Sequence, residues 1–454
     1  MATKPNIAKL TATSPEIMNT IRSDASAYYR DMVPRATNNS DSIKEIGGII
    51  MQYQALQNEF LSALVNRIGR VLITSRMFDN PWSMFKKGLL EYGETVEEIF
   101  VNICNAQQFN PSVAETNVFK REIPDVKAAF HVMNYQKFYK QTISDDQLRQ
   151  AFLSWQGITD LIARIVDAMY TAANYDEFQV MKYMIAKNII NGNFYPVQIQ
   201  EPSTANARAI ASSARKVSNN LTFLGTQYNP AGVYTSTPRD DQFIIVNTAF
   251  DAIMSVEVLA TSFNMTEAEF FGHRVLVDGF GNLDAQRLNE LLADNPGYEE
   301  IGSDDLAALN DIPAIIVDRN WFMIFDNLFK FTEIYNGEGL YWNYFYHVWK
   351  TFSVSPFANA VMLNNVAAAI TSVSVNPSAV TVNKGNTSQF TANVVTTGFA
   401  PKDVTWSINS TLSNISSTGL LTVAANETAS SITVTATSKF DGKTKGTATV
   451  TVPA

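Results

Sequence analysis

The chain changes character at about Ala367. Residues 370–454 contain no Arg, His or Cys and only one Trp, and they consist largely of short runs in which Val, Thr and Ser alternate. β-branched residues fit the pleated surface of a strand, and a period of two turns one face of each strand inward. This segment is therefore expected to form a small all-β domain, distinct from the body that precedes it.

The tail has the strand and turn spacing of an immunoglobulin-like sandwich. Turn-forming residues such as Asn376-Pro377 and Asp441-Gly442 separate its runs. Short strands at such intervals are typical of that architecture. A domain of this kind at the end of a chain usually binds a partner or is displayed on a surface. The function of the protein must therefore be inferred from the body that carries it. The predicted strands are residues 371–375, 389–394, 404–408, 432–437 and 447–452.

Composition limits the possible classes of protein. A chain of 454 residues is too long for one ordinary core, so two to three domains are expected. With 46% hydrophobic and 17% charged residues, the chain is globular and not disordered. The net charge is −9; the tail after residue 367 contributes +2, which leaves −11 for the body. An acidic body without a basic run argues against sequence-specific nucleic-acid binding, although not against contact with bulk DNA.

Neither cysteine usage nor the N-terminus indicates export. The single Cys104 excludes an intrachain disulfide and is expected to be a buried, unreactive thiol made in a reducing compartment. Residues 1–10 lack the apolar region of a signal peptide, and no apolar run approaches the ~20 residues of a membrane span. We therefore expect a protein made and kept soluble in a cytoplasm.

The first 70 residues are predicted to be helical. Ser14-Pro15-Glu16 predicts a helix start, with Ser14 as the cap and Pro at the first helical position, and this helix extends to Pro34. A second helix is predicted over 42–68, with a kink or frayed turn at Gly47-Gly48. The broad apolar stripes fit either ordinary core helices or an arm that packs on a neighbouring subunit.

Residues 71–143 predict a two-stranded extension. Strands are expected at 71–74, 95–103 and 127–133, and the intervening segment 109–124 is polar and charged. An extension of this length is unusual inside a compact domain, so we interpret it as functional or intersubunit. A two-stranded ribbon is marginal in water on its own and needs a surface to lie on.

A long helix is predicted from Asp145 to Asn191. Ser144 and Gln147 match a capping box, and Asn191-Gly192-Asn193 ends the helix. Its apolar stripe weakens at 171–174, so one long helix or two in tandem are both possible. The segment 197–366 then alternates strands and helices, which indicates the α+β class. Its predicted strands are 243–247, 274–278, 314–318, 321–326, 331–335 and 341–354, and its predicted helices are 251–263 and 265–270.

No pattern in the sequence predicts catalysis or ligand binding. His131, His273 and His347 lack metal-ligand spacing and are each interpreted as strand residues. Nucleophile-elbow, phosphate-loop and calcium-loop motifs are absent from the sequence. The aromatic stretch 341–349 has no interleaved Arg or Lys and is interpreted as sheet core. We expect no catalytic, cofactor-binding or metal-binding residues, no cofactor and no enzymatic activity.

The order of these elements resembles that of tailed-bacteriophage major capsid proteins with the Hong Kong 97-type (Johnson) fold. The similarity is greatest to the small phi29-like podoviruses, whose capsid proteins also carry a C-terminal immunoglobulin-like group 2 (BIG2) domain. It covers nearly the whole chain, and residues 318–355 are its most specific part, whereas 203–235 depart most. The motifs that carry it are residues 66–69, 85–88, 95–99, 118–124, 138–146, 318–327 and 339–355, with Pro377, Gly385, Trp406 and 416–423 in the tail.

The resemblance implies a capsid body over 1–366 and a BIG2 domain over 370–454. It implies a structural protein that self-assembles, with a scaffolding protein, into an icosahedral or prolate shell around double-stranded DNA. The implied partners are other copies of the same chain, the scaffolding protein, and portal and head–tail components; no membrane is implied. The implied location is the virion. Within the body it implies an N-terminal arm (1–70), an extended loop (76–140), a spine helix and peripheral domain (144–196), an axial domain (225–335) and peripheral return strands (336–366).

Two other readings of the sequence are considered. Immunoglobulin-like tails also occur in bacterial surface proteins and adhesins, but that hypothesis predicts an export signal and an anchor. A cytoplasmic enzyme would need a cleft with perturbed carboxylates. On the capsid hypothesis, the tail is expected on the outer surface, where it attaches to the host or contacts other subunits.

Overall fold

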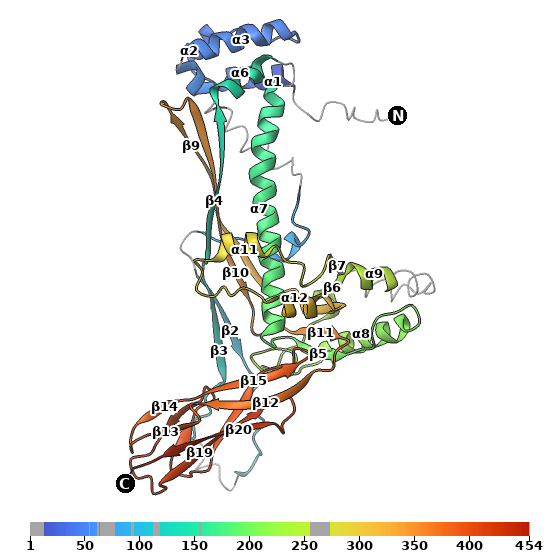
Figure 1. The fold of residues 1–454 in the computed structure, drawn as a ribbon, viewed down its shortest axis with the longest axis vertical. Helices are drawn as coiled ribbons and strands as arrows, with labels where there is room; N and C mark the ends of the chain where they lie inside the picture. The colour runs from blue at the N-terminus through green and yellow to red at the C-terminus, as the bar shows by residue number, and fades with distance from the viewer. Residues whose placement is uncertain are drawn as a thin grey trace. The chain divides into compact units, whose positions relative to one another are not determined.

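The computed structural model describes residues 13–53, 55–60, 63, 78–91, 95–111, 119–153, 157–254 and 273–453 (Figure 1). The chain divides into two compact units. The first contains residues 1–95, 132–180 and 324–352, and the second contains 96–131, 181–323 and 353–454. Among the described residues, no helix is long and apolar enough to cross a membrane.

Helices α1 (Ser14–Asp24), α2 (Ala27–Met32) and α3 (Ser40–Gln52) open the first unit. The carboxylate of Glu16 accepts a hydrogen bond from the backbone N–H of Thr13 at 2.9 Å. The cap is therefore Thr13, and the prediction of Ser14 was wrong by one residue. Asn39 caps α3 by accepting a bond from the N–H of Asp41 at 3.2 Å. Residues 64–74, where the second helix and a strand were predicted to continue, lie outside the described part.

Helix α3 runs through Gly47-Gly48 without interruption, so the predicted kink is wrong. A Cβ added at Gly47 would lie 2.5 Å from the Cβ and Cγ of Phe152, which belongs to α6 (Asp145–Leu153). At Gly48 a Cβ would meet nothing within 4 Å. The absence of a side chain at Gly47 thus allows α3 and α6 to approach closely, and this explains its place in a helix.

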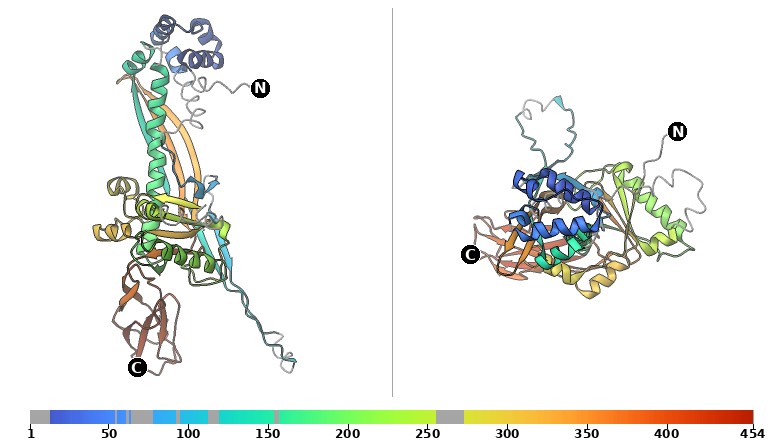
Figure 2. Two further views of the ribbon diagram at one scale, coloured as in Figure 1. Left: turned by 90° about the vertical axis from the view of Figure 1, so that its right-hand side faces the viewer. Right: turned by 90° about the horizontal axis from the view of Figure 1, so that it is seen from above.

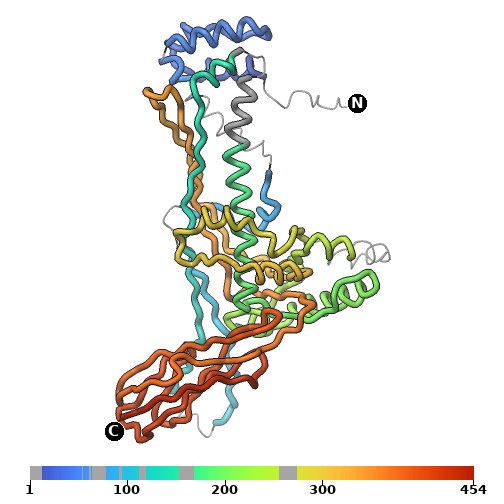
Figure 3. Tube along the Cα trace, viewed as in Figure 1, coloured from blue at the N-terminus to red at the C-terminus, as the bar shows by residue number. Residues whose placement is uncertain are grey.

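The predicted capping box is present at the start of α6. The Ser144 hydroxyl accepts from the N–H of Gln147 at 3.3 Å, and the Gln147 side chain accepts from the N–H of Ser144 at 3.2 Å. Helix α7 (Gly157–Ile190) then passes from the first unit into the second and continues through 171–174 (Figure 3). Gly192, with φ of +78°, follows its end as the sequence predicted.

The first unit contains a four-stranded sheet in the order β1-β9-β10-β4. Strands β10 and β4 pair antiparallel from Tyr341 with Ser144 to Lys350 with Tyr135. The two predicted strands at 321–326 and 331–335 form one continuous strand, β9. The 3-10 turn η2 (Ser83–Phe85) precedes β1. The strands are β1 (Lys86–Leu89), β4 (Tyr135–Ser144), β9 (Phe322–Asn336) and β10 (Tyr341–Val354).

In the aromatic stretch of β10, Trp342 to Tyr344 are all buried, and beyond Tyr344 buried and half-buried residues alternate. Tyr346 is buried and stacks on Tyr170 of α7 with ring centroids 4.7 Å apart. Phe345 and His347 are only half-buried, and the Nζ of Lys140 from β4 lies 5.8 Å above the ring of Phe345. The prediction of sheet core thus holds for one face of the strand, and the other face is mostly half-buried.

A five-stranded sheet in the order β5-β11-β8-β6-β7 forms the centre of the second unit. Its strands β5 (Tyr195–Gln198), β6 (Gln242–Asn247), β7 (Arg274–Val277), β8 (Ala314–Asp318) and β11 (Ala360–Asn364) are short. Helices α8 (Ala207–Leu221) and α9 (Thr248–Met254) share a core with one face of this sheet. The unit also contains η4 (Arg239–Asp241), α11 (Ala285–Leu292) and α12 (Ser303–Asn310). Most of the predicted helix 251–263 and all of 265–270 lie outside the described residues.

The tail forms the predicted β-sandwich. Phe390 is fully buried at its centre, and Leu421, Ile432 and Val450 pack in the same core. Trp406 is only partly buried against that core. The strands are β12 (Ala369–Asn376), β13 (Ala379–Thr381), β14 (Thr387–Gln389), β15 (Thr391–Thr397), β16 (Val404–Ile408), β17 (Asn414–Ile415), β18 (Leu420–Thr422), β19 (Ser431–Ser438) and β20 (Lys445–Thr451).

Candidate assembly surfaces

The predicted extension is an antiparallel ribbon of β2 (Val96–Val101) and β3 (Val126–His131). Its pairs run from Val96 opposite His131 to Val101 opposite Val126. Directly opposite residues share a face of the ribbon, because side chains alternate along each strand. Figure 2 shows the two strands of the ribbon (light blue) running side by side.

One face of the ribbon is fixed to the body of the second unit. The ring of Phe100 lies 5.6 Å from that of Phe357, and the Nζ of Lys127 donates to the backbone carbonyl of Ala231 at 2.5 Å. The carboxylate of Glu98 accepts a hydrogen bond from the Ser355 hydroxyl at 2.8 Å. These contacts supply the surface that a two-stranded ribbon needs for stability.

His131 belongs to this anchored face and is fully buried. Its Nδ1 lies 2.7 Å from the Ser353 hydroxyl and its Nε2 lies 3.3 Å from a Glu98 carboxylate oxygen. His131 and His347 are strand residues as predicted, whereas His273 directly precedes β7. In the part of the chain that the structure describes, no group of three His, Cys, Asp or Glu side chains could hold a metal ion.

The opposite face of the ribbon is exposed and, apart from Glu97, apolar. Ile99, Val101 and Phe130 retain 59%, 58% and 64% of their surface, and the loop beyond carries Phe109 and Phe119, each about 90% exposed. Soluble monomers rarely leave a contiguous apolar patch of this kind in water. This face therefore has the composition of a surface that another protein covers.

A buried group of charges lies in the first unit. The Nζ of Lys350 in β10 forms an ion pair with the Glu177 carboxylate of α7 and also contacts Asp326 of β9. Lys86 of β1 lies 3.3 Å from Glu177 and 2.6 Å from Asp326. Two cations thus face two carboxylates, and Asn80 donates a further bond to Glu177 at 2.6 Å.

The pKa values of this cluster follow from its geometry. Burial raises the pKa of the Glu177 carboxyl, but the charges of Lys350 and Lys86 outweigh burial and hold it below its usual value. Burial lowers the pKa of Lys86, and its two carboxylate neighbours raise it by more. The two ion pairs of Glu177 tie α7 to β1 and β10, so the arrangement stabilises the helix–sheet contact, and Asp326 links the same two lysines to β9.

Two family models match consecutive parts of the chain. Residues 18–364 match the model of the phi29-like phage major capsid protein, and residues 369–450 match the bacterial Ig-like domain (group 2). The chain belongs to the phi29-like phage major capsid protein family. The fold class predicted from the sequence, an α+β capsid body followed by an immunoglobulin-like sandwich, is thereby confirmed. Membership of this family also confirms the virion as its location.

Similar proteins are major capsid proteins of Bacillus phages. That of phage B103 is 39% identical over 432 residues, which cover 93% of this chain and 90% of the relative. That of phage PZA is 37% identical over 423 residues, or 91% and 88% of the two chains. A chain in the capsid structure of Staphylococcus phage Andhra aligns with a TM-score of 0.48 at 18% identity, over 64% of this chain and 86% of that one. The major capsid protein of a phage head is therefore the function that the family supports.

Two features of the capsid protein differ from what its sequence predicted. Cys104 is exposed on the loop that follows β2, so the prediction of a buried thiol is wrong. The apolar face of the ribbon was also not identified, although the alternation of Ile99, Val101 and Ile103 was a signal for it. Because such alternation normally marks a strand face that is buried, it could have indicated a face that becomes buried only on assembly.

Proposed function

We propose that many copies of this chain assemble, together with a scaffolding protein, into an icosahedral or prolate head shell that encloses double-stranded phage DNA. The exposed apolar face of the β2–β3 ribbon carries this proposal. The other face of the ribbon is anchored to the body, so the exposed side chains of this face are accessible to a neighbouring copy. Portal and head–tail components are further proposed partners, and the chain is proposed to have no enzymatic activity.

The energetics of the ribbon support a contact between copies. Burial of apolar surface contributes about 25 cal/mol per Å². Exposed aromatic side chains such as Phe109, Phe119 and Phe130 are of a type that is enriched in the buried centres of protein interfaces. Since each copy repeats the same contact, modest pairwise energies add up over a closed shell.

The net charge supports the role of a container for DNA. A chain of net charge −9 repels packaged DNA mildly, and the sequence of its acidic body contains no basic run of the kind that favours sequence-specific binding. The shell therefore encloses DNA without reading its sequence.

We further propose the division of the chain into a capsid body over 1–366 and a displayed domain over 370–454. In the body, 1–70 form the N-terminal arm, 76–140 the extended loop, 144–196 the spine helix and peripheral domain, 225–335 the axial domain and 336–366 the return strands. The terminal domain lies on the outer surface, where it attaches to the host or contacts other subunits. Its independent core around Phe390 supports a separately folded module.

Assembly of purified protein tests this function. Ile99→Asp combined with Phe130→Asp should abolish the closed shells that the unmodified chain forms with its scaffold, as seen by negative-stain microscopy. Leu412→Asp, at an exposed apolar residue of the terminal domain, is the matched control and should leave shells intact. A persistently monodisperse monomer, with or without scaffold, would contradict the proposal. Deletion of 370–454 should preserve the shells if that domain is displayed.

A further inference from the structure

Helix α8 presents a basic face to solvent. Arg208 and Lys216 are exposed, and Arg215 is half-exposed beside them. At 100° per residue these three positions lie on the side of the helix opposite Ile210, Ala214 and Val217, which are buried. From 202 to 239 the chain contains four basic residues and no acidic one. We name Arg208, Arg215, Lys216 and Arg239 the basic face.

Two exposed apolar residues adjoin this basic face. Phe223 and Leu224 directly follow α8 and are 72% and 61% exposed. The η4 residue Arg239 remains close to the end of the helix, because it donates a hydrogen bond to the Asn219 side chain at 2.7 Å. Large apolar side chains next to cations are the composition of a protein interface, in which the apolar groups contribute affinity and the charges select the partner.

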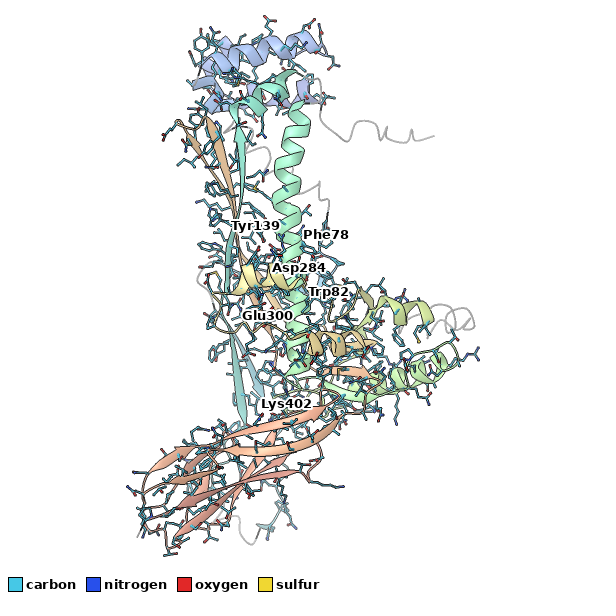
Figure 4. The ribbon with its side chains drawn as sticks, in the orientation of Figure 1. Phe78, Trp82, Tyr139, Asp284, Glu300 and Lys402 are labelled. Atoms are coloured by element: carbon cyan, nitrogen blue, oxygen red, sulfur yellow. The ribbon has the colours of Figure 1, made fainter. Side chains whose placement is uncertain are left out.

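The segment 278–311 of the same unit has the opposite charge. It contains nine Asp or Glu residues and a single base, Arg287. Asp278 and Glu299 form ion pairs with Lys182 and Lys187 of α7. The remaining exposed carboxylates, which we name the acidic face, are Glu290, Asp294, Glu300, Asp304, Asp305 and Asp311. Glu300 is labelled in Figure 4.

The two faces belong to different sides of the five-stranded sheet. Helix α8 shares its core with Ile244 and Val246 of β6, whereas Ile245, between them, points to the other side and is also buried. The buried residues of α11 and α12 are not part of the α8 core. In Figure 2, α8 (green) and the yellow helices α11 and α12 lie apart on either side of the strands.

We propose that the basic face of one copy binds the acidic face of the next copy. Two different surfaces on opposite sides of one domain form a head-to-tail contact, which closes into a ring when the rotation per copy permits. The partner is a second copy because the complementary charge is carried by the same chain, outside the ribbon that the proposed function uses. This inference rests on the proposed function, since a ring of copies presupposes self-assembly.

Charge reversal tests the contact. Arg208→Glu with Lys216→Glu should raise the protein concentration needed for assembly about tenfold at ~0.1 M salt, because two cations are lost from the basic face and the two introduced carboxylates repel the acidic face. Asp294→Lys with Glu300→Lys, placed in the loop between α11 and α12, should have a similar effect. The four substitutions together place carboxylates introduced at positions 208 and 216 opposite ammonium groups introduced at 294 and 300, while Arg215, Arg239 and the other four acidic residues stay unchanged. This variant should assemble at a lower concentration than either double variant. Lys443→Glu with Lys445→Glu, in the terminal domain, is the charge-matched control and should change nothing.

The outcomes separate this inference from the proposed function. If the unmodified chain assembles and neither reversal affects it, or if the folded four-substitution variant does not recover, the head-to-tail contact is wrong while the proposed function stands. If Arg208→Glu with Lys216→Glu abolished binding to a double-stranded DNA fragment and left assembly unchanged, the basic face would be a DNA contact. That result would also overturn the inference. Failure of the unmodified chain to assemble with scaffold would overturn both.

A crosslinking measurement needs no variant and guards against misfolded ones. Carbodiimide treatment of shells built from equal amounts of isotopically light and heavy protein should join Lys216 of one copy to a carboxylate of the acidic face of another. Mixed light–heavy peptides of this kind are the expected result. Their absence, when other crosslinks between copies are recovered, would overturn the proposed contact.

Discussion

Gly47 of α3 and Phe152 of α6 are in such close contact that the first has no room for a side chain. A Cβ at Gly47 would lie 2.5 Å from the Cβ of Phe152, a separation that packed atoms do not adopt. Phe152 is itself buried, and its ring lies 5.4 Å from that of Phe60. The two helices are far apart in sequence and pack closely at Gly47. The need for glycine at this position therefore follows from the tertiary structure and not from the local sequence.

Substitution of the two adjacent glycines should have opposite effects. Gly47→Ala should destabilise the first unit by about 1–3 kcal/mol, because Phe152 must shift. Gly48→Ala, where nothing lies within 4 Å, should stabilise it by about 1 kcal/mol through better helix propensity. Urea unfolding of both variants, followed by circular dichroism, measures the difference. Equal effects at the two positions would contradict the close packing of α3 on α6.

The buried ion cluster should be sensitive to the loss of one partner. Lys350→Met leaves the buried carboxylate of Glu177 with less compensation, and we expect a loss of about 3 kcal/mol in the free energy of unfolding. Lys187→Met, which removes the partner of the exposed Glu299, is the control and should change stability little. Chemical denaturation of the two variants compares them. A similar, small effect for both would show that the cluster does not tie α7 to the sheet.

The terminal domain should lose stability in acid through Glu427. Hydrogen bonds from Ser410, Ser413 and nearby backbone N–H groups hold the pKa of this carboxyl at about 2, below the usual 4.5. Because the folded pKa is the lower one, the stabilisation is present above pH 4.5 and is lost as pH falls from 4.5 towards 2. Glu427→Gln should flatten that dependence in thermal melts of the intact chain. An unchanged acid slope would show that the hydrogen bonds do not stabilise the ionised form.

Local sequence patterns predicted the elements that local chemistry determines. The Ser144–Gln147 capping box and the alternation of β2 and β3 required no knowledge of the rest of the chain. Helix α8 was missed although its buried residues Ile210, Ala214, Val217 and Leu221 recur at helical spacing, a signal that the sequence did contain. β11, all of whose residues are buried, offered no alternation to recognise.

The candidate surfaces depended on information that the sequence does not contain. The alternation of apolar residues in β2 marks a face, but only the structure shows that the opposite face is the one anchored to Phe357. From the sequence alone, Gly47 predicts a break in the helix, and only the structure shows its contact with Phe152. Likewise, the basic and acidic faces become complementary surfaces only once the sheet separates them.

Substitution of Phe390 should destabilise the sandwich more than substitution of Trp406. Phe390 is fully buried, so Phe390→Ala should cost about 3–5 kcal/mol and unfold the terminal domain. Trp406 is partly exposed to solvent, so Trp406→Ala should cost less. Proteolysis of the two variants, with mass spectrometry of the fragments, would locate the unfolding. Equal destabilisation would place the centre of the core elsewhere than at Phe390.

Cys104 should report directly on burial of the extended loop. Its thiol is exposed in the single chain and lies close in sequence to the apolar residues Ile103 and Phe109. We expect rapid modification by a maleimide reagent before assembly, and at least a tenfold slower reaction once a neighbouring copy covers the loop. Mass spectrometry of unassembled protein and of shells gives the two rates, and protein denatured after assembly controls for irreversible loss of the thiol. Equal rates in the two states would show that this part of the loop stays in solvent. Any contact between copies would then have to lie on the ribbon itself, nearer to Phe130.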